Sequence, residues 1–378
     1  MREVFIVAAK RTAVAPRRGA LAKLQAHELA APLIRDLLVS SGIDEADVGS
    51  VVMGNALYGG GNPARLAALL AGLPETVPAL TIDTQCCSGL DAIGLGVQRI
   101  RSGTDRAVIA GGLESWSRSP RRFVREPDER GQTREYQRPP FSPWPERDPD
   151  LLESAAGLAR SFAVERQSQE RFAIESHHKA LQARQQLTDE IVAIDGVGVD
   201  QFSRELSPAL CRRLPLIAGD TEHGLTTATV AVEADAAAAV LLVGAEVLQA
   251  LTLTRRPLRV IGVIAEGGDP GMPMLAPVRA CKKLLTSAGL SVSDIALAEV
   301  MEAFAVQAML TIERIGLDPA KTNIGGGGLA RGHPVGASGA INVVRLWHGM
   351  QSLKAGKTGL ATIAAAGGLG TGLLGEIV

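Results

Sequence analysis

Aromatic residues and cysteines are scarce in this chain of 378 residues. Phe, Trp and Tyr together make up 3% of the sequence, and there are only four cysteines. Four cysteines in so long a chain do not form a disulfide framework, and two of them, Cys86 and Cys87, are adjacent. We therefore expect free thiols in a reducing compartment, which predicts a cytoplasmic protein.

Neither sign of charge dominates, and no hydrophobic run is long. Lys and Arg number 39 against 40 Asp and Glu, which gives a formal net charge of −1 and argues against a nucleic-acid or polybasic membrane binder. The longest apolar block, residues 236–245, is far shorter than the ~20 residues of a membrane span. The apolar run near the N-terminus is also too short for the h-region of a signal peptide. We predict no nucleic-acid partner and no membrane insertion.

Small apolar residues are abundant, and they alternate between two periodicities. Hydrophobic residues make up 46% of the chain, and there are 42 glycines. Short buried-strand patterns alternate with helical ones, which is typical of an α/β fold with a largely parallel sheet. The strands are expected at residues 4–8, 48–53, 79–83 and 106–110, and the helices at 27–40, 63–71 and 88–101.

The middle of the chain has a different texture. Residues 117–149 are rich in Arg and Pro and lack apolar periodicity, which indicates a surface insertion. A helical pattern over residues 151–182 follows, then a region broken by Gly and Pro. Regular α/β patterning resumes at Asp235.

Two segments far apart in the chain resemble each other. Residues 87–89 (Cys-Ser-Gly) and 337–339 (Ala-Ser-Gly) each open a helical pattern, and the strand after each helix ends in Gly-Gly. This similarity predicts two related halves whose loop-to-helix turns face each other.

The first candidate site is the sequence DTQCCSGL at residues 83–90. A thiol between a strand and a helix lies among the free amides of the helix start, where the helix dipole favours a thiolate and lowers the pKa of the thiol. A buried cysteine that only fills the core is the alternative. The residues themselves do not decide between Cys86 and Cys87.

The second candidate site is His333, which stands between Gly332 and Pro334 and follows four consecutive glycines. Glycine-rich irregular backbone can approach a ligand closely, and the repeat places this histidine opposite Cys86. A thiol nucleophile and an imidazole are the minimum for acyl transfer through a thioester. A structural or solvated histidine is the alternative, and no Cys/His group has zinc-site spacing, so no metal is predicted.

Together these motifs resemble the thiolase family over essentially the whole chain. The matching blocks, in the family's order, are VFIVAAKRTAVAPRRG near the start, CCSGL, AGGLESWS (110–117), MEAFA (301–305), GGLARGHPVGASG (327–339) and the final AAAGGLGTG. The resemblance implies two duplicated βαβαβαββ halves in a five-layered αβαβα core. It assigns 1–115 and 234–255 to the N-terminal half, 116–233 to a loop domain covering the coenzyme A site, and 256–378 to the C-terminal half.

The resemblance also implies residue roles. Cys86 becomes the acylated nucleophile, and His333 activates it and helps to bind a thioester oxygen. Met301, Ala303, Phe304 and Ala231 become substrate-binding residues. A coenzyme A thioester is then the substrate, with no bound cofactor, and the assembly is a homodimer or homotetramer.

The chain departs from the family pattern at three places. The family's second cysteine aligns with Ala364, and the first of the three glycines that follow aligns with Ala366, whose amide still suits an oxyanion at some steric cost. The family's Asn before Glu-Ala-Phe is Met301. The family's Asn-Ala-Ser-Gly stretch aligns with residues 229–232, where Ala231 replaces a serine that contacts pantetheine.

All three departures affect the half of the site that generates a carbanion. A positioned acid or base contributes a factor of about 10²–10⁴, which the methyl group of Ala364 cannot supply. Glu302 could act as an auxiliary base if its surroundings raised its pKa, and a structural carboxylate is the alternative. Cys86 and His333, which serve acylation, are both retained.

These observations predict a thiolase-like acyltransferase. It forms an acyl-S-cysteine intermediate from an acyl-CoA or 3-oxoacyl-CoA and passes the acyl group to a carbon nucleophile or to coenzyme A. Two alternatives are a non-catalytic subunit that binds coenzyme A or serves as structure, and a thioester hydrolase.

Overall fold

The computed structural model describes residues 2–58, 60–125, 131–136 and 138–378. Its first half alternates strands and helices close to the predicted positions, and the helices predicted at 63–71 and 88–101 have those bounds. The elements of this half are β1 (Val4–Thr12), α1 (Ala26–Ser41), β3 (Ser50–Gly54), α2 (Pro63–Ala71), β4 (Ala79–Ile82), α3 (Ser88–Arg101), β5 (Ala107–Ser115) and, after the insertion, β11 (Ala234–Gly244) and α7 (Ala245–Leu248).

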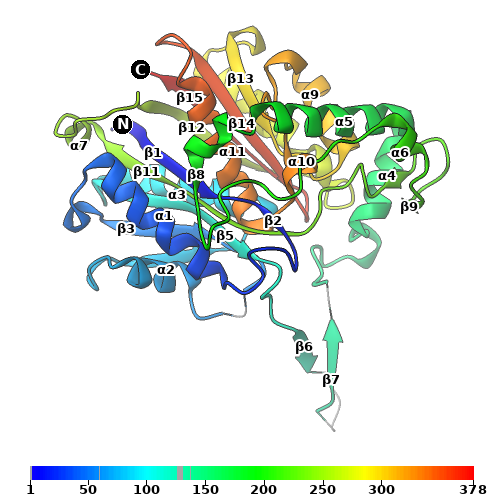
Figure 1. Ribbon diagram of the computed structural model, residues 1–378, viewed down its shortest axis with the longest axis horizontal. Helices are drawn as coiled ribbons and strands as arrows, with labels where there is room; N and C mark the ends of the chain where they lie inside the picture. The colour runs from blue at the N-terminus through cyan, green and yellow to red at the C-terminus, as the bar shows by residue number, and fades with distance from the viewer. Residues whose placement is uncertain (1, 59, 126–130, 137) are drawn as a thin grey trace.

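The second half repeats this order of elements (Figure 1). Its elements are β12 (Leu258–Gly267), α8 (Ala276–Ala288), β13 (Ile295–Val300), α9 (Ala305–Ile315), α10 (Gly328–Arg331), α11 (Val335–Met350), β14 (Thr358–Ala365) and β15 (Leu369–Ile377). No strand in the described chain matches β4, but a parallel bridge between Ala298 and Thr322 occupies the corresponding place beside β13.

The two halves have the same pairing pattern. In the first, the strand order is β4-β3-β5-β11-β1, with parallel pairs on β3 and antiparallel pairs on β11. In the second it is β13-β14-β15-β12, again parallel and then antiparallel. Two residue pairs between β1 and β12 join the halves.

Side chains on alternate positions of the strands build three hydrophobic cores. On β5, Val108 faces the central core with α3 and α11, whereas Ile109 faces an outer core with α1 and α2. On β15, Leu373 faces the central core and Leu374 faces the other outer core, with α8 and α9. Helices therefore lie outside and between the strands of the two halves, which confirms the predicted αβαβα layering.

Glycines bring the two central helices into close contact. A Cβ on Gly89 would lie 2.7 Å from the carbonyl oxygen of Gly336, and one on Gly339 would lie 2.8 Å from the amide nitrogen of Leu90. The helix starts of α3 and α11 therefore face each other, as the repeat predicts, and the chain segments just before them meet at the same place.

The insertion contains a projecting hairpin and helices packed on the second half (Figure 1). The helical pattern over 151–182 is two helices rather than one, because Ala163 adopts a left-handed φ of 50° between them. Positions 126–130 and 137 of the Arg-rich segment lie outside the described residues. The elements are β6 (Arg122–Arg125), β7 (Thr133–Tyr136), α4 (Leu151–Ser161), α5 (Arg166–Ala183), β8 (Ile191–Val192), α6 (Pro208–Arg212), β9 (Leu216–Ala218) and β10 (Leu225–Thr226).

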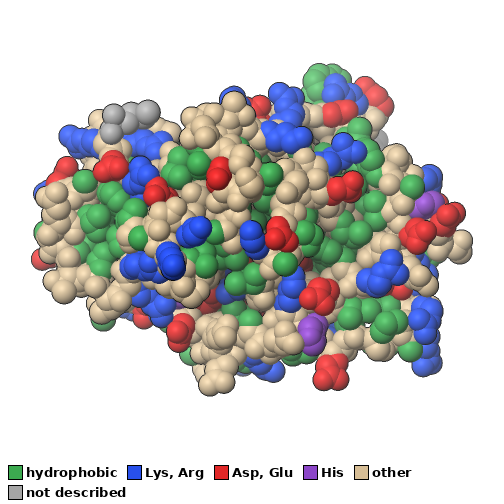
Figure 2. All heavy atoms as spheres, turned by 90° about the horizontal axis from the view of Figure 1, so that it is seen from above, with side chains coloured by type: hydrophobic (Ala, Val, Ile, Leu, Met, Phe, Trp, Pro, Cys, Tyr) green, Lys and Arg blue, Asp and Glu red, His purple; other side chains and the backbone are tan. Residues whose placement is uncertain are grey.

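Acidic and basic side chains are interspersed on the face shown in Figure 2, as the balanced composition suggests. In the part of the chain that the structure describes, no helix combines the length and apolar character needed to cross a membrane.

Close packing of α3 on α11 makes Gly339 intolerant of a side chain. We expect Gly339→Ala to lower the free energy of unfolding by about 1–3 kcal/mol, because the added methyl group overpacks the contact with Leu90. Gly157→Ala in α4 is the matched control: nothing lies within 4 Å of its added Cβ. That substitution should stabilise the helix by about 0.5–1 kcal/mol. Chemical denaturation measures both changes, and equal effects of the two would contradict the packing argument.

Candidate active site

The nucleophile candidate lies on a constrained turn between β4 and α3. Gln85 has a left-handed φ of 56°, and its amide donates to Asp83 Oδ1 at 2.8 Å. A single 3-10 turn over Gln85–Cys87 then leads into α3. Cys86 is half-buried, whereas Cys87 is fully buried with its thiol 3.6 Å from the carbonyl oxygen of Ile363. The geometry thus separates two cysteines that the sequence left equivalent.

His333 lies directly against Cys86. Its Nε2 is 3.1 Å from Cys86 Sγ, and its Nδ1 is 2.7 Å from the hydroxyl oxygen of Ser338. Its amide donates to the carbonyl of Val232 at 2.7 Å, and its carbonyl accepts from the indole of Trp116 at 3.2 Å. The two predicted site residues, 247 positions apart, are therefore in contact, with the histidine held at three further points.

Burial determines the protonation of this pair. Removal from water raises the pKa of Cys86 to about 12, and the carboxylates of Glu114 and Asp83 add to the rise. Backbone amides of Ala366 and Cys86 oppose it only partly. Burial also lowers the pKa of His333 to about 4. The expected low thiol pKa is therefore wrong: desolvation outweighs the helix-start effect, and at neutral pH the pair is a thiol beside a neutral imidazole.

A cavity of about 110 Å³ opens onto both groups, and its wall is mainly apolar. The predicted residues Ala231, Ala303 and Phe304 line it. Gln307 is the one polar side chain among its described lining residues other than Cys86 and His333. The remaining lining residues are Leu151, Val230, Pro273, Met274, Ala364, Ala365 and Ala366.

Two predicted residues do not reach this cavity. Met301 is buried, in contact range of Gly328, and does not line the wall. Glu302 turns its carboxylate away, to accept from Ser176 Oγ at 2.6 Å and from Asn323 Nδ2 at 2.7 Å. It also accepts from the amide of Leu329 at the start of α10. The structure gives Glu302 the role of a buried structural carboxylate, not that of a base at the cavity.

Ala366 begins the turn between β14 and β15. Gly367 and Gly368 take the left-handed conformation, with φ of 78° and 81°, whereas Ala366 is not among the residues with positive φ. The expected steric cost of this alanine is therefore absent. Its backbone amide, together with that of Cys86, favours the charged form of the nucleophile and so lowers the pKa of Cys86, against the larger effect of burial.

Ala364, which the motif resemblance aligns with the family's second cysteine, lines the cavity and carries no thiol. The other thiols do not replace it. Cys211 in α6 and Cys281 in α8 are buried and do not line the cavity. Within the described residues, no group of three or more His, Cys, Asp or Glu side chains is arranged to hold a metal ion.

Sequence reasoning missed Gln307 and the partners of His333. Gln307 lies four residues after Ala303 and accepts from its amide at 3.2 Å, so helical spacing beyond the MEAFA block could have suggested it. Ser338 was visible as part of the repeat, but its contact with His333 depends on how the turn before α11 folds. Trp116 carries no such signal, because 217 residues separate it from His333.

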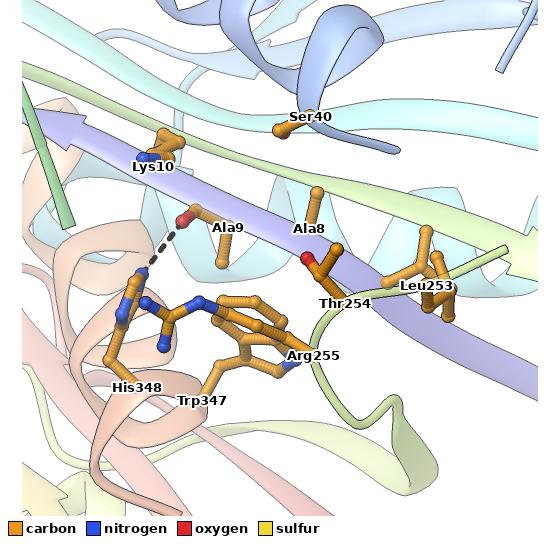
Figure 3. Close-up of a pocket in the computed structure, with 10 residues that line it drawn as sticks. Ala8, Ala9, Lys10, Ser40, Leu253, Thr254, Arg255, Trp347 and His348 are labelled. Carbon is orange, nitrogen blue, oxygen red and sulfur yellow. Dashed lines mark hydrogen bonds between the residues drawn. The ribbon is translucent and has the colours of Figure 1, made fainter. Parts of the chain in front are cut away.

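A separate cavity, shown in Figure 3, lies between β1 and the end of α11. It contains Lys10, Arg255 and His348, and the ring of His348 is bound to the carbonyl of Ala9 at 2.9 Å. None of the residues that line it is a cysteine or serine paired with a base, so it offers no comparable nucleophile.

Fold and site together define a duplicated α/β enzyme in which a cysteine of one half meets a histidine of the other. The family model for the thiolase N-terminal domain matches residues 4–246, and that for the thiolase C-terminal domain matches residues 256–376. The chain belongs to the thiolase family, as its motifs predicted.

Individual relatives match along nearly their whole length. A Bacillus subtilis protein named "Putative acetyl-CoA C-acetyltransferase YhfS" is 38% identical over 99% of both chains. An acetyl-CoA acetyltransferase of Pseudomonas aeruginosa is 36% identical over 99% of both. The crystal structure of the Bacillus anthracis acetyl-CoA acetyltransferase superposes with a TM-score of 0.89 at 28% identity, covering 100% of this chain and 99% of that one.

Proposed function

We propose that this thiolase-family acyltransferase forms an acyl thioester on Cys86, using an acyl-CoA or 3-oxoacyl-CoA as donor. The observation that carries the proposal is the 3.1 Å contact between Cys86 Sγ and His333 Nε2 at the wall of an apolar cavity. The names of the relatives, which include acetyl-CoA acetyltransferases, support a coenzyme A thioester as the substrate.

Acylation begins from the neutral pair. The thiol proton of Cys86 passes to Nε2 of His333 as the sulfur attacks the thioester carbonyl. With an acyl-CoA, the bond from the carbonyl carbon to the coenzyme A sulfur then breaks, and the departing thiolate takes the proton from Nε2. With a 3-oxoacyl-CoA, the sulfur attacks the 3-oxo carbonyl instead, the bond between C2 and C3 breaks, and C2 of the departing CoA thioester takes the proton from Nε2. The low pKa of His333 favours this return, because a buried imidazolium readily gives up its proton.

The backbone supplies the oxyanion site. The amides of Cys86 and Ala366 both favour negative charge at the nucleophile, and we place the oxygen of an attacked carbonyl near them. Each donor of an oxyanion hole is worth about 10²–10³ in rate. Both donors are backbone groups, so the replacement of glycine by alanine at 366 leaves this part of the site intact.

Fewer catalytic groups are available for the second half-reaction, in which the acyl group passes from Cys86 to an acceptor. The cavity wall offers His333 as its one described acid or base, because Ala364 carries no thiol and Glu302 faces elsewhere. The acyl group therefore passes to an acceptor that needs no second protein base, such as coenzyme A itself or a carbon nucleophile activated by decarboxylation. One water molecule needs about 10–15 Å³ of such a cavity. A cavity of about 110 Å³ therefore has room for a short acyl group.

The intermediate can be weighed directly. Incubation with acetyl-CoA should add one acetyl group to the intact protein, as read by mass spectrometry, and Cys86→Ala should abolish the adduct. Cys87→Ala is the matched control and should keep it, because Cys87 points into the core. An adduct that survives Cys86→Ala would contradict the proposal, and no adduct on the wild-type protein would favour the non-catalytic alternative. Rapid loss of the adduct to water would instead indicate a hydrolase.

Restoring the missing thiol tests proton transfer at the α-carbon of the substrate. We expect Ala364→Cys to raise the rate of acetoacetyl-CoA cleavage by coenzyme A about 10²-fold or more, because it adds a positioned acid to the cavity wall for the carbon released when the C2–C3 bond breaks. Ala364→Ser, of nearly the same size, should give no such gain. Equal rates in the wild-type, Cys and Ser proteins would show that another group already performs this proton transfer.

We further propose a homo-oligomer in the cytoplasm. Strand β4 ends the sheet, and helix α2, which packs on it, exposes three leucines, Leu66, Leu69 and Leu70. An unpaired edge beside an apolar patch suits a second copy of this chain. The four cysteines form no disulfide, which supports a reducing compartment.

A charged residue among the exposed leucines of α2 tests the proposed homo-oligomer. Leu69→Lys should lower the molar mass measured by sedimentation toward that of one chain, whereas Val39→Lys on α1, where the valine is already 84% exposed, should not. A wild-type protein that sediments as a single chain would contradict the proposal, as would an unchanged oligomer of the Leu69→Lys variant.

A further inference from the structure

Ser338 has a hydrogen-bonding arrangement that can hold one tautomer of His333. Its hydroxyl oxygen lies 2.7 Å from Nδ1 of His333 and 3.1 Å from the carbonyl oxygen of Pro334. Ser338 is buried, with 2% of its surface exposed, so these contacts are made away from solvent. A hydroxyl has one proton to donate and can accept through its lone pairs.

Two proton arrangements satisfy these distances. In the first, Nδ1–H donates to Ser338, the hydroxyl donates to Pro334, and the thiol of Cys86 donates to Nε2. In the second, the hydroxyl donates to Nδ1 and Nε2–H donates to the sulfur. The first makes three hydrogen bonds and the second two, of which one ends on sulfur, a weak acceptor. The first arrangement is therefore the more stable.

We propose that Ser338 is a positioning residue that keeps the proton of neutral His333 on Nδ1, so that Nε2 presents its lone pair to Cys86. This inference rests on the proposed function for its consequence, because only this tautomer can receive the thiol proton. Burial keeps the imidazole neutral, so the position of its single proton decides whether it can act as a base.

The internal repeat shows why Ser338 is free to do this. Its counterpart Ser88 also donates to a carbonyl one turn back, that of Gln85, but accepts from the amide of Thr84 at 2.9 Å. The residue matching Thr84 is Pro334, four positions before Ser338. Proline has no amide proton. The lone pair that is occupied in the first half is thus left in the second half for His333, which corresponds to Asp83.

The contact between Ser338 and Nδ1 of His333 suits both the neutral and the protonated imidazole. When Nε2 gains the thiol proton, Nδ1 remains a donor to Ser338, so neither the ring nor the hydroxyl has to turn. The ring is further fixed by the bonds of its backbone to Val232 and Trp116. Proton transfer then moves one hydrogen between Sγ and Nε2 without rearrangement of the surrounding groups.

Nitrogen NMR of the resting protein tests the tautomer without any substrate. In protein with ¹⁵N-labelled histidine, the His333 signals, assigned by their loss in His333→Ala, should show a protonated Nδ1 and an unprotonated Nε2 at neutral pH. A protonated Nε2 in the wild-type protein would overturn the proposal, even if Cys86 is acylated normally. The expected tautomer without an acetyl adduct would instead leave Ser338 as proposed and refute the acyl-enzyme.

Ser338→Ala tests the consequence. Its His333 signals should shift toward protonated Nε2, and the rate constant of acylation should fall about 10–100-fold, the range for loss of an orienting partner, with little change in KM. Ser41→Ala is the control, since buried Ser41 likewise donates to the carbonyl four residues back, that of Leu37, far from His333. A fall in rate with an unchanged tautomer would assign Ser338 a merely structural role and overturn the proposal.

Discussion

The contact between the side chains of Cys86 and His333 depends on nearly every other feature of this fold. Cys86 and His333 meet because α3 and α11 begin at the same place, and they begin there because Gly89 and Gly339 let the two helix starts pack without side chains between them. The duplicated strands set the distance between these helices. The site is thus a product of the whole architecture, with one half supplying the sulfur and the other the imidazole.

Burial gives this contact its chemical character. The cavity wall is apolar, and its low polarity keeps both the thiol and the imidazole uncharged. In the mechanism that we propose, this neutral pair becomes charged only as the sulfur attacks, and the amides of Cys86 and Ala366 then favour the negative charge. The protein therefore stabilises the reacting state more than the resting one.

Much of the fold could be predicted from the sequence, because strand and helix periodicities are local properties. The Ser-Gly repeat even indicated which turns face each other. The predictions that failed concern properties set by the surrounding tertiary structure, which local sequence patterns do not contain. The thiol pKa was predicted from the helix start alone, whereas desolvation by the packed halves dominates it. Glu302 was adjacent to the site in sequence, but the direction of its carboxylate is set by Ser176 and Asn323.

The departures from the family pattern have unequal structural weight. Ala366 keeps a usable amide without left-handed backbone, and Met301 lies outside the cavity wall. Ala364 lies in the wall itself and offers no ionisable group there. On the proposed mechanism, the chain has the groups for taking up an acyl group and has no second thiol in the cavity wall, which limits the acceptors rather than acylation itself.

The protonation of Cys86 is the most direct test of this account. The ultraviolet absorbance of its thiolate, taken as the difference between the wild-type protein and Cys86→Ala, can be followed from neutral to alkaline pH. With a pKa raised to about 12, the account predicts no thiolate signal at neutral pH and its appearance only in strongly alkaline solution. A full thiolate signal at neutral pH would contradict it, since the resting pair would then be an imidazolium beside a thiolate.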